Sequence, residues 1–457
     1  MTDMLDAVLA HVDAHADEAV ARVMDYVRHP SVSATGEGVR AVAGMLVEHL
    51  GRLGFAAEAV EGPGHPFVLG RRDVDPGRPT VLLYGHYDVQ PADPLGAWTT
   101  PPFEPALRDG RIWARGIGDN KGQHMAQLLA IEAHLAVTGT LPCNVIFLLE
   151  GEEEVGSPNI AAFVRENAHR LDADLVVTAD GPLHASGAPV VYMGVRGVAS
   201  FDLVAREARR DVHSGNFGGV VPNAIWTLVH LLGTMRDAEG RITVEGLARG
   251  VAPPTDAERA AMDRLPLDLP ALMRDLGLDR LDAPEGRPYW DRLMMHPTLT
   301  INGIHGGYGG PGSKTVLPCE AVAKCDVRLV PPMVPEGVFA ALEAHVARHA
   351  PGVRVVRHGG MAPSRTPVDG PWTAPVRDAL RRARGVEPLV HPSMGGSLPD
   401  YVWTGILGRP AFVVPYANAD QRNHAPDENL KVVRFLDGIR CGAALLDRIG
   451  AAGRPEG

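Results

Sequence analysis

The stretch VLLYGHYDVQP, residues 81–91, joins an uninterrupted apolar run to the polar side chains that directly follow it. Its first four residues are apolar or aromatic, and a short run bounded by glycine is typical of a strand buried on both faces. His86 and Asp88 come next, and Pro91 closes the segment. The pattern predicts a buried strand with an imidazole and a carboxylate just beyond its carboxyl end.

Three later segments repeat this pattern: VIFLLEGEEEVGS at 145–157, LVVTADGP at 175–182 and FVVPYANADQRNHAPDEN at 412–429. Helix-like segments lie between the runs, and strands that alternate with helices predict a wrapped α/β sheet. In open α/β sheets, ligands bind in the crevice beyond the carboxyl ends of the strands. We therefore expect one crevice to collect the polar residues that follow the runs, namely His86, Asp88, Glu150 to Glu154, Asp180 and His424.

The side chains expected in this crevice have the chemistry of a metal site. Two imidazoles and three carboxylates suit zinc, cobalt or manganese, and five ligands serve two ions if one carboxylate bridges them. The candidates are His86, Asp119, Glu154, Asp180 and His424. Any one of them alone has a simpler interpretation, since Asp119 stands in a Gly-rich turn before a helix and could equally be an N-terminal cap.

The run Glu152–Glu154 admits two interpretations. A charge run is usually a solvated turn. However, adjacent carboxylates raise one another's pKa unless a cation intervenes, so a metal ion beside one and proton transfer by its neighbour would also explain the run. Asp88 likewise could close a turn, or it could accept the second imidazole N–H of His86 and fix its tautomer.

Between residues 197 and 365 the pattern changes. FDLVARE and TLTING alternate polar and apolar residues, and NAIWTLVHLLGTM has a helical period. Alternating strands suit an antiparallel sheet with one face in water. We therefore predict a catalytic domain formed by residues 1–196 and 366–457, with an α+β domain inserted over 197–365.

Composition excludes several classes of function. Lys and Arg total 44 and Asp and Glu total 55, giving a net charge of −11 without a basic block, so neither nucleic acid nor an anionic membrane is an expected partner. The apolar runs are far shorter than the roughly 20 residues of a membrane helix. The N-terminus shows no secretory signal, and the four cysteines show no CxxC spacing. These features predict a cytoplasmic protein without a disulfide scaffold.

These motifs together resemble a known family, the co-catalytic zinc metallopeptidases and amidohydrolases that include carnosine-type dipeptidases, glutamate carboxypeptidase, acetylornithine deacetylase and succinyl-diaminopimelate desuccinylase. The carnosine-type branch is the most similar, and the resemblance spans nearly the whole chain. It rests on GHYDVQP (85–91), ARGIGDNKG (114–122), EGEEEVGS (150–157), VTADGP (177–182), DVHSGNFGG (211–219), KTVLP (314–318), DVRLVP (326–331), GGS (395–397) and NHAPDEN (423–429).

The resemblance implies a di-zinc peptidase fold and divides the metal ligands between two ions. His86 and Asp180 would hold one ion, Glu154 and His424 the other, and Asp119 would bridge them. Zinc is the expected metal, with manganese or cobalt as alternatives. These are the same five residues named above as candidates for the metal site.

The resemblance also implies catalytic roles for two carboxylates. Asp88 would orient His86. Glu153 would be the general base that takes a proton from a water held between the metal ions and returns it to the leaving amine.

For the segment 197–365 the resemblance implies a lid domain that mediates dimerisation and closes over the substrate. His213 would reach the active site of the partner subunit and stabilise the tetrahedral oxyanion. Arg328 would bind the substrate carboxylate with its planar fork, near Thr315 and Ser397. Without the resemblance, His213 is a turn residue and Arg328 a surface cation on a strand.

One position departs from the carnosine-type branch, because Met394 stands where that branch has an acidic residue before GGS. An acid there would suit a free α-ammonium, so its absence leaves an N-acyl or N-carbamoyl substrate open, unless Asp400 compensates. The prediction is a homodimeric two-metal hydrolase that cleaves dipeptides or small peptides with a free carboxylate. An N-acyl- or N-carbamoyl-amino-acid amidohydrolase is the alternative, and a catalytically silent small-ligand-binding dimer is a more remote one.

Overall fold

The computed structural model describes residues 4–282 and 286–454. The chain forms two compact units, the first made of Met1–Gly194, Arg365–Pro392 and Val402–Gly457 and the second of Val195–Ser364 and Ser393–Tyr401. The predicted boundaries differ by one or two residues at 194/195 and 364/365, and they also assign residues 393–401 to the catalytic domain. In the structure, this segment instead contacts residues of the second unit, with Arg196 N–H donating to the Met394 carbonyl oxygen at 3.2 Å.

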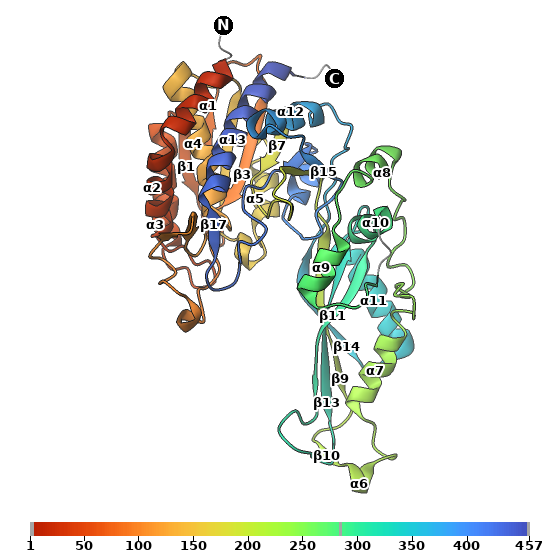
Figure 1. The fold of residues 1–457 in the computed structure, drawn as a ribbon. Helices are drawn as coiled ribbons and strands as arrows, with labels where there is room; N and C mark the ends of the chain where they lie inside the picture. Colours follow the sequence, from red (N-terminus) through yellow and green to blue (C-terminus); the bar gives the residue numbers. More distant parts are fainter. Residues whose placement is uncertain (1–3, 283–285, 455–457) are drawn as a thin grey trace. The chain divides into compact units, whose positions relative to one another are not determined.

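A mixed eight-stranded sheet forms the centre of the first unit (Figure 1). Its order is β1 (Ala56–Val60), β2 (Phe67–Arg72), β6 (Asn144–Glu150), β3 (Thr80–His86), β7 (Leu175–Thr178), β16 (Ala411–Val413), β8 (Val190–Tyr192) and β15 (Leu389–His391). The strand β3 pairs in parallel with both β6 and β7, and β16 pairs in parallel with β7. Every residue of β3, β6 and β7 is buried, which confirms the strands predicted from the apolar runs and the α/β class.

Helices cover this sheet. The helix α13 (Val432–Ala452) contacts α1 (Met4–Ala14), α4 (Lys121–Thr138) and α12 (Thr373–Arg384). The helix α4 also contacts α1 and β3. The helix α2 (Ala16–Val27) joins this layer through α4, and α3 (Val39–Arg52) packs on β1 and β2. The short helix α5 (Ile160–Glu166) contacts η3 (Val402–Ile406).

A small antiparallel sheet joins two distant segments of the first unit. Its strands are β17 (Asn429–Lys431), β5 (Arg111–Trp113) and β4 (Ala106–Arg108). Asn429 pairs with Trp113 in this sheet. The loop after β5 leads to Asp119, and the loop before β17 contains His424. The sheet therefore anchors two candidate ligand loops beside each other.

The second unit is built on an antiparallel four-stranded sheet in the order β11 (Thr298–Gly306), β13 (Glu320–Leu329), β9 (Gly197–Arg206) and β14 (Arg354–Met361). Buried and half-buried residues alternate along β9, as expected for a sheet with one wet face. The helices α7 (Ala224–Gly233) and α11 (Pro335–His349) pack on this sheet. The unit confirms the predicted α+β class of the inserted segment.

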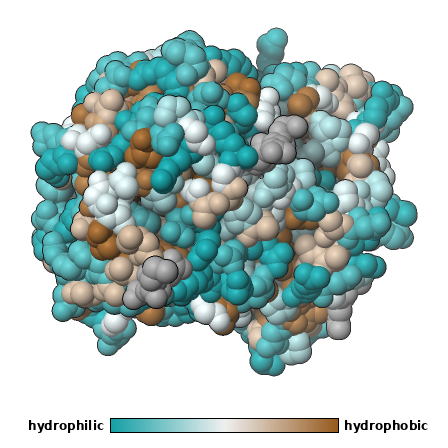
Figure 2. Space-filling view, turned by 90° about the horizontal axis from the view of Figure 1, so that it is seen from above, coloured by the Kyte–Doolittle hydropathy of each residue, from teal (hydrophilic) through white to brown (hydrophobic). Residues whose placement is uncertain are grey.

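Smaller elements complete the second unit. They are the paired strands β10 (Val212–His213) and β12 (Val316–Leu317), and the helices α6 (Ser214–Phe217), α8 (Asp256–Met262), α9 (Leu269–Leu276) and α10 (Arg287–Met295). Among the described residues, no helix is both long enough and apolar enough to cross a membrane. The face drawn in Figure 2 is largely hydrophilic, with apolar residues scattered over it.

Candidate metal centre

His86 is the last residue of β3, and its ring is completely buried. Its Nδ1 lies 3.0 Å from the carbonyl oxygen of Asp88 and 3.3 Å from the Oδ1 of the same residue. Both neighbours are acceptors, so in the neutral ring Nδ1 carries the proton and Nε2 has the lone pair. This is the tautomer that a metal-binding imidazole needs. The hydrogen bond goes to the backbone carbonyl of Asp88, and the carboxylate expected to accept this proton lies slightly farther away.

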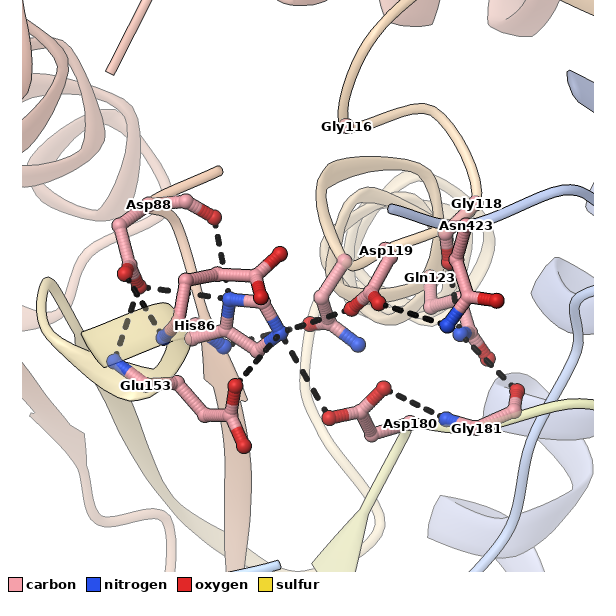
Figure 3. Close-up of polar contacts among 12 residues, drawn as sticks. His86, Asp88, Gly116, Gly118, Asp119, Gln123, Glu153, Asp180, Gly181 and Asn423 are labelled. Atoms are coloured by element: carbon pink, nitrogen blue, oxygen red, sulfur yellow. Dashed lines mark hydrogen bonds and ion pairs between the residues drawn. The ribbon is translucent and has the colours of Figure 1, made fainter. Parts of the chain in front are cut away.

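Carboxylates surround the free Nε2 of His86 (Figure 3). Asp119 Oδ1 lies at 3.1 Å, Asp180 Oδ2 at 3.6 Å and Glu153 Oε2 at 4.0 Å. Single donor atoms from His86, Asp119 and Asp180 all lie within 4.8 Å of one another, so they can hold one ion together.

A second group of donors forms around the other oxygen of Asp119. His424 Nε2 lies 3.1 Å from Asp119 Oδ2 and 3.0 Å from Glu154 Oε2. Donor atoms of Asp119, Glu154 and His424 also lie within 4.8 Å of one another. Asp119 thus presents Oδ1 to one imidazole and Oδ2 to the other, which is the geometry of a bridging carboxylate.

Loops hold the second group in place. His424 has a backbone φ of +58°, a left-handed conformation that is rare for a residue with a side chain and that occurs preferentially at functional sites. Its neighbour Asn423 donates its Nδ2 to Asp119 Oδ2 at 3.0 Å, and Gln90 Nε2 donates to Glu154 Oε2 at 3.0 Å. Asp119 and Glu154 are therefore oriented by amide groups as well as by His424.

The electrostatics of the cluster favour a cation. Burial lowers the pKa of His86, but its contacts with Asp119, Asp180 and Asp88 raise it well above the ordinary value. Hydrogen bonds to Asp119 and Glu154 raise the pKa of His424 to about 10.

Two glutamates of the cluster also have raised pKa values, which disfavours their charged form. Burial raises the pKa of Glu153, and the neighbouring charges of Asp180, Glu154 and Asp119 raise it further. The pKa of Glu154 is also raised, first by burial and then by Asp119. These directions mean that the carboxylates repel one another, and divalent cations would relieve that repulsion. The donors are imidazole nitrogens and carboxylate oxygens, a set that fits zinc, manganese or cobalt.

Glu153 begins the short 3-10 turn η2 (Glu153–Val155) at the edge of the cluster. Its backbone N–H donates to Asp88 Oδ1 at 3.2 Å, and its side chain remains 14% exposed. Figure 3 shows this carboxylate pointing toward His86 and lying beside Asp180. A partly exposed carboxylate with a raised pKa can exchange protons with water and substrate.

The other predicted site residues form two pairs in the second unit. His213 Nδ1 accepts a hydrogen bond from the Gly215 N–H at 2.9 Å, and its Nε2 lies 3.2 Å from Thr315 Oγ1. Arg328 Nη1 donates to Ser397 Oγ at 2.8 Å. The structure thus joins His213 to Thr315 and Arg328 to Ser397, whereas the metal-ligand candidates all belong to the first unit.

Met394 and Asp400, the two positions considered for binding a substrate ammonium group, have different environments. Met394 is partly buried, and its carbonyl oxygen accepts the backbone N–H of Arg196. The Asp400 side chain is completely buried. In this structure Asp400 therefore does not present an exposed carboxylate in place of the acid that Met394 replaces.

Several residues that orient the candidate ligands were not predicted from the sequence, among them Asn423, Gln90 and Glu428. Asn423 and Glu428 belong to the NHAPDEN string, and Gln90 belongs to GHYDVQP. The sequence signal that could have identified these three residues is their position within the two strings. Amide and carboxylate side chains close to a metal ligand often hold the loop that carries it. Glu428 is fully buried and accepts hydrogen bonds from the loop that carries Asp119.

Comparison with known proteins gives a consistent result. Residues 82–448 match the sequence profile of peptidase family M20/M25/M40. The Cys-Gly metallodipeptidase dug1 of Schizosaccharomyces pombe is 31% identical, with 95% of this chain and 96% of that protein covered. The human Beta-Ala-His dipeptidase is 30% identical, with 96% and 92% covered. The solved structure of the M20 family metallo-carboxypeptidase Sso-CP2 from Sulfolobus solfataricus has a TM-score of 0.89 at 34% identity, covering 95% of this chain and 99% of that one.

Proposed function

Since this chain belongs to peptidase family M20/M25/M40, we propose that it hydrolyses the peptide bond of dipeptides or small peptides that carry a free carboxylate. One observation carries the proposal: Asp119 directs one carboxylate oxygen to His86 and the other to His424. The dipeptidase names of relatives that match over nearly the whole chain support the substrate class.

We infer that the two donor groups hold two divalent ions, with zinc first and manganese or cobalt as alternatives. Asp119 belongs to both groups, with His86 and Asp180 in one and Glu154 and His424 in the other. When bound, the ions would supply Lewis-acid polarisation of the substrate carbonyl and lower the pKa of a water toward about 7. Asp88 holds His86 in the tautomer that leaves Nε2 free for this purpose.

Glu153 is the proposed general base. Its raised pKa lets it accept a proton from the attacking water and later give that proton to the leaving amine. The backbone hydrogen bond to Asp88 fixes its position beside His86. This assignment needs the carboxylate to be ionised before attack, and bound cations favour the ionised form.

His213 and Arg328 are the proposed substrate-handling residues of the second unit. Because His213 Nδ1 accepts from Gly215, the neutral ring carries its proton on Nε2, which can donate to a developing oxyanion. The Arg328 guanidinium offers a planar fork for the substrate carboxylate, beside Ser397. Thr315, which contacts His213, would lie near the bound backbone.

Assembly and location are also part of the proposal. We propose a homodimer formed through the second unit, which serves as a lid. The edge strand β11 carries half-exposed Ile301 and Ile304, and such apolar side chains on a strand edge are typical of an interface. We also propose a cytoplasmic location, on the acidic composition and the sparse cysteines.

Met394 supports a second candidate function. An acid would bind a free α-ammonium there, and a thioether cannot, so an N-acyl- or N-carbamoyl-amino-acid amidohydrolase is the alternative. The same two-ion chemistry serves both reactions, because each breaks an amide bond by attack of water.

The test is amine release from a panel of free-amine dipeptides, N-acyl amino acids and N-carbamoyl amino acids. The protein is loaded with zinc or manganese, and Glu153→Ala is the blank. We expect hydrolysis of the free-amine dipeptides. Activity on acylated or carbamoylated substrates alone would support the amidohydrolase alternative. No activity on any substrate of the panel would favour a non-catalytic small-ligand-binding protein.

A further inference from the structure

Glu428 is a completely buried carboxylate that no step of the proposed reaction uses. Its Oε1 accepts the backbone N–H groups of Gly118 at 2.9 Å and Asp119 at 3.0 Å. Its Oε2 accepts the backbone N–H of Gly116 at 3.0 Å and Nη1 of Arg115 at 2.8 Å. One carboxylate thus receives four hydrogen bonds from a loop of five residues, 115–119.

This arrangement is an internal anion site built from backbone amides. The Arg115 side chain is only 1% exposed, so it relies on Glu428 for its counter-charge. Removing the carboxylate would leave three N–H groups and a guanidinium without this acceptor in a buried place, which is costly. Glu428 therefore determines the conformation of the loop.

The same residue also belongs to the segment that carries the other imidazole. Glu428 follows His424 by four residues, and its carbonyl oxygen accepts the Ala114 N–H at 3.1 Å. Directly after it, Asn429 pairs with Trp113 in the small sheet. The chain just before Asp119's loop is thereby attached to the chain that follows His424.

We propose that Glu428 is a positioning residue that sets the distance between Asp119 and His424, and so determines the affinity of the metal site that these two residues share with Glu154. This inference rests on the proposed metal centre. Asp119 Oδ2 and His424 Nε2 stand 3.1 Å apart, and both come from loops rather than strands. His86 instead ends β3, and Asp180 lies just beyond β7, and Glu428 takes no part in the pairing of these two strands.

The expected consequence is selective. Glu428→Gln keeps the size of the side chain and one oxygen, but it directs an NH2 group at N–H donors and removes the counter-charge of Arg115. Mutation of a residue that orients a metal ligand typically lowers the metal affinity 10- to 100-fold. We expect the ion held by Asp119, Glu154 and His424 to lose affinity by roughly that factor. The other ion shares Asp119 but keeps His86 and Asp180, which lie outside the Glu428 contacts, so it should lose less.

The experiment measures metal affinity and stoichiometry. Zinc is titrated into the metal-free full-length protein against a chromophoric chelator, and the absorption spectrum of the cobalt-loaded protein reports on ligand geometry. The matched control is Glu132→Gln, which removes a half-buried carboxylate of the first unit that accepts from Arg22 and lies beside His49. We expect the control to bind two ions with wild-type affinity. A folded Glu428→Gln protein with wild-type affinities at both sites and an unchanged cobalt spectrum would overturn the proposal.

A second variant keeps the test valid if Glu428→Gln does not fold. Glu428→Asp retains the charge beside Arg115 but has a shorter reach, so we expect the same selective loss with a smaller factor. Equal weakening of both ions in Glu428→Asp would point to a general structural effect and overturn the positioning role.

Asp119→Asn separates this inference from the proposed function. If Asp119→Asn loses metal and Glu428→Gln binds as the wild type does, the metal centre stands and the positioning role fails. If Asp119→Asn itself binds both ions normally, the bridging assignment fails and the positioning role fails with it.

Discussion

Asp88 Oδ2 accepts the backbone N–H of Glu154 at 3.0 Å, so an aspartate beyond β3 holds a candidate metal ligand beyond β6. Its other oxygen accepts the N–H of Glu153 and lies 3.3 Å from His86 Nδ1. One buried carboxylate therefore contacts a candidate ligand imidazole, a candidate ligand carboxylate and the proposed base.

Replacing Asp88 should therefore weaken metal binding without removing a ligand. In Asp88→Asn, the amide NH2 group would face N–H donors from Glu153, Glu154 or His86. We expect metal affinity and kcat/KM to fall by about 10- to 100-fold. Competition with a chelator and steady-state kinetics measure these quantities. Asp75→Asn, which changes an exposed turn aspartate, is the control, and wild-type affinity in Asp88→Asn would contradict this role.

Glu153→Ala should separate metal binding from turnover. The variant keeps every candidate ligand, so its metal content should stay nearly unchanged, while loss of general-base catalysis should lower kcat by about 10²- to 10⁴-fold. In His424→Ala, by contrast, metal content itself should fall, because Asp119 and Glu154 lose their shared imidazole partner. Elemental analysis and single-turnover kinetics distinguish the two effects. Near-normal turnover in Glu153→Ala would exclude it as the base.

The catalytic half of the fold could be predicted from sequence because its signals are local. The apolar runs in β3, β6 and β7 are short, continuous and followed at once by polar residues, and parallel strands place such residues at one edge. This accounts for the clustering of His86 with Asp180. The sequence could not supply the strand order, which comes from long-range packing.

The domain assignment of residues 393–401 could not be predicted from local sequence patterns. Their contacts reach far along the chain, with Ser397 bonding to Arg328 and Gly395 accepting from Arg196 Nε at 2.9 Å. The segment contains two glycines and has no helical or strand period. A boundary drawn from periodicity therefore could not assign it to the second unit. Asn423, which contacts Asp119 across 304 positions, was missed for the same reason.

His213→Ala should lower kcat more than it changes KM. The Gly215 N–H occupies Nδ1 of the ring and leaves Nε2–H available as a donor, and an oxyanion forms only on the way to the transition state. Removing one such donor typically costs about 10²- to 10³-fold in kcat. Steady-state kinetics on a cleaved dipeptide measure both constants. A change confined to KM would instead mean that His213 binds the ground state.

Glu132 gives a prediction about stability and pH. Burial alone raises its pKa, but hydrogen bonds from Arg22 and His49 lower it to about 2 from the ordinary 4.5. The folded pKa is depressed, so the stabilisation is fully present above pH 4.5 and is lost as the pH falls toward 2. The shift corresponds to roughly 3 kcal/mol before screening, which the one-third exposure of Arg22 reduces.

The measurement compares urea unfolding of the wild type and Glu132→Gln at pH 7 and pH 3.5. The wild type should be more stable at pH 7, and its advantage should shrink by roughly 1 kcal/mol at pH 3.5. Taking the difference between the two proteins cancels the acid sensitivity of the metal centre, which both share. An advantage that grows toward low pH would reject the assignment of the depressed pKa to Glu132.

Ile304→Lys should convert the proposed homodimer to monomers. Ile304 is 49% exposed on β11, which is an edge strand of its sheet. A charge on this strand opposes association through that edge. If His213 acts in the partner's active site, the monomer should keep its metal content and lose most of its kcat. Sedimentation velocity and kinetics test both parts. Val433→Lys replaces a 53% exposed valine in the first unit and should leave both unchanged. A monomeric Ile304→Lys protein with full activity would show that each subunit completes its own site.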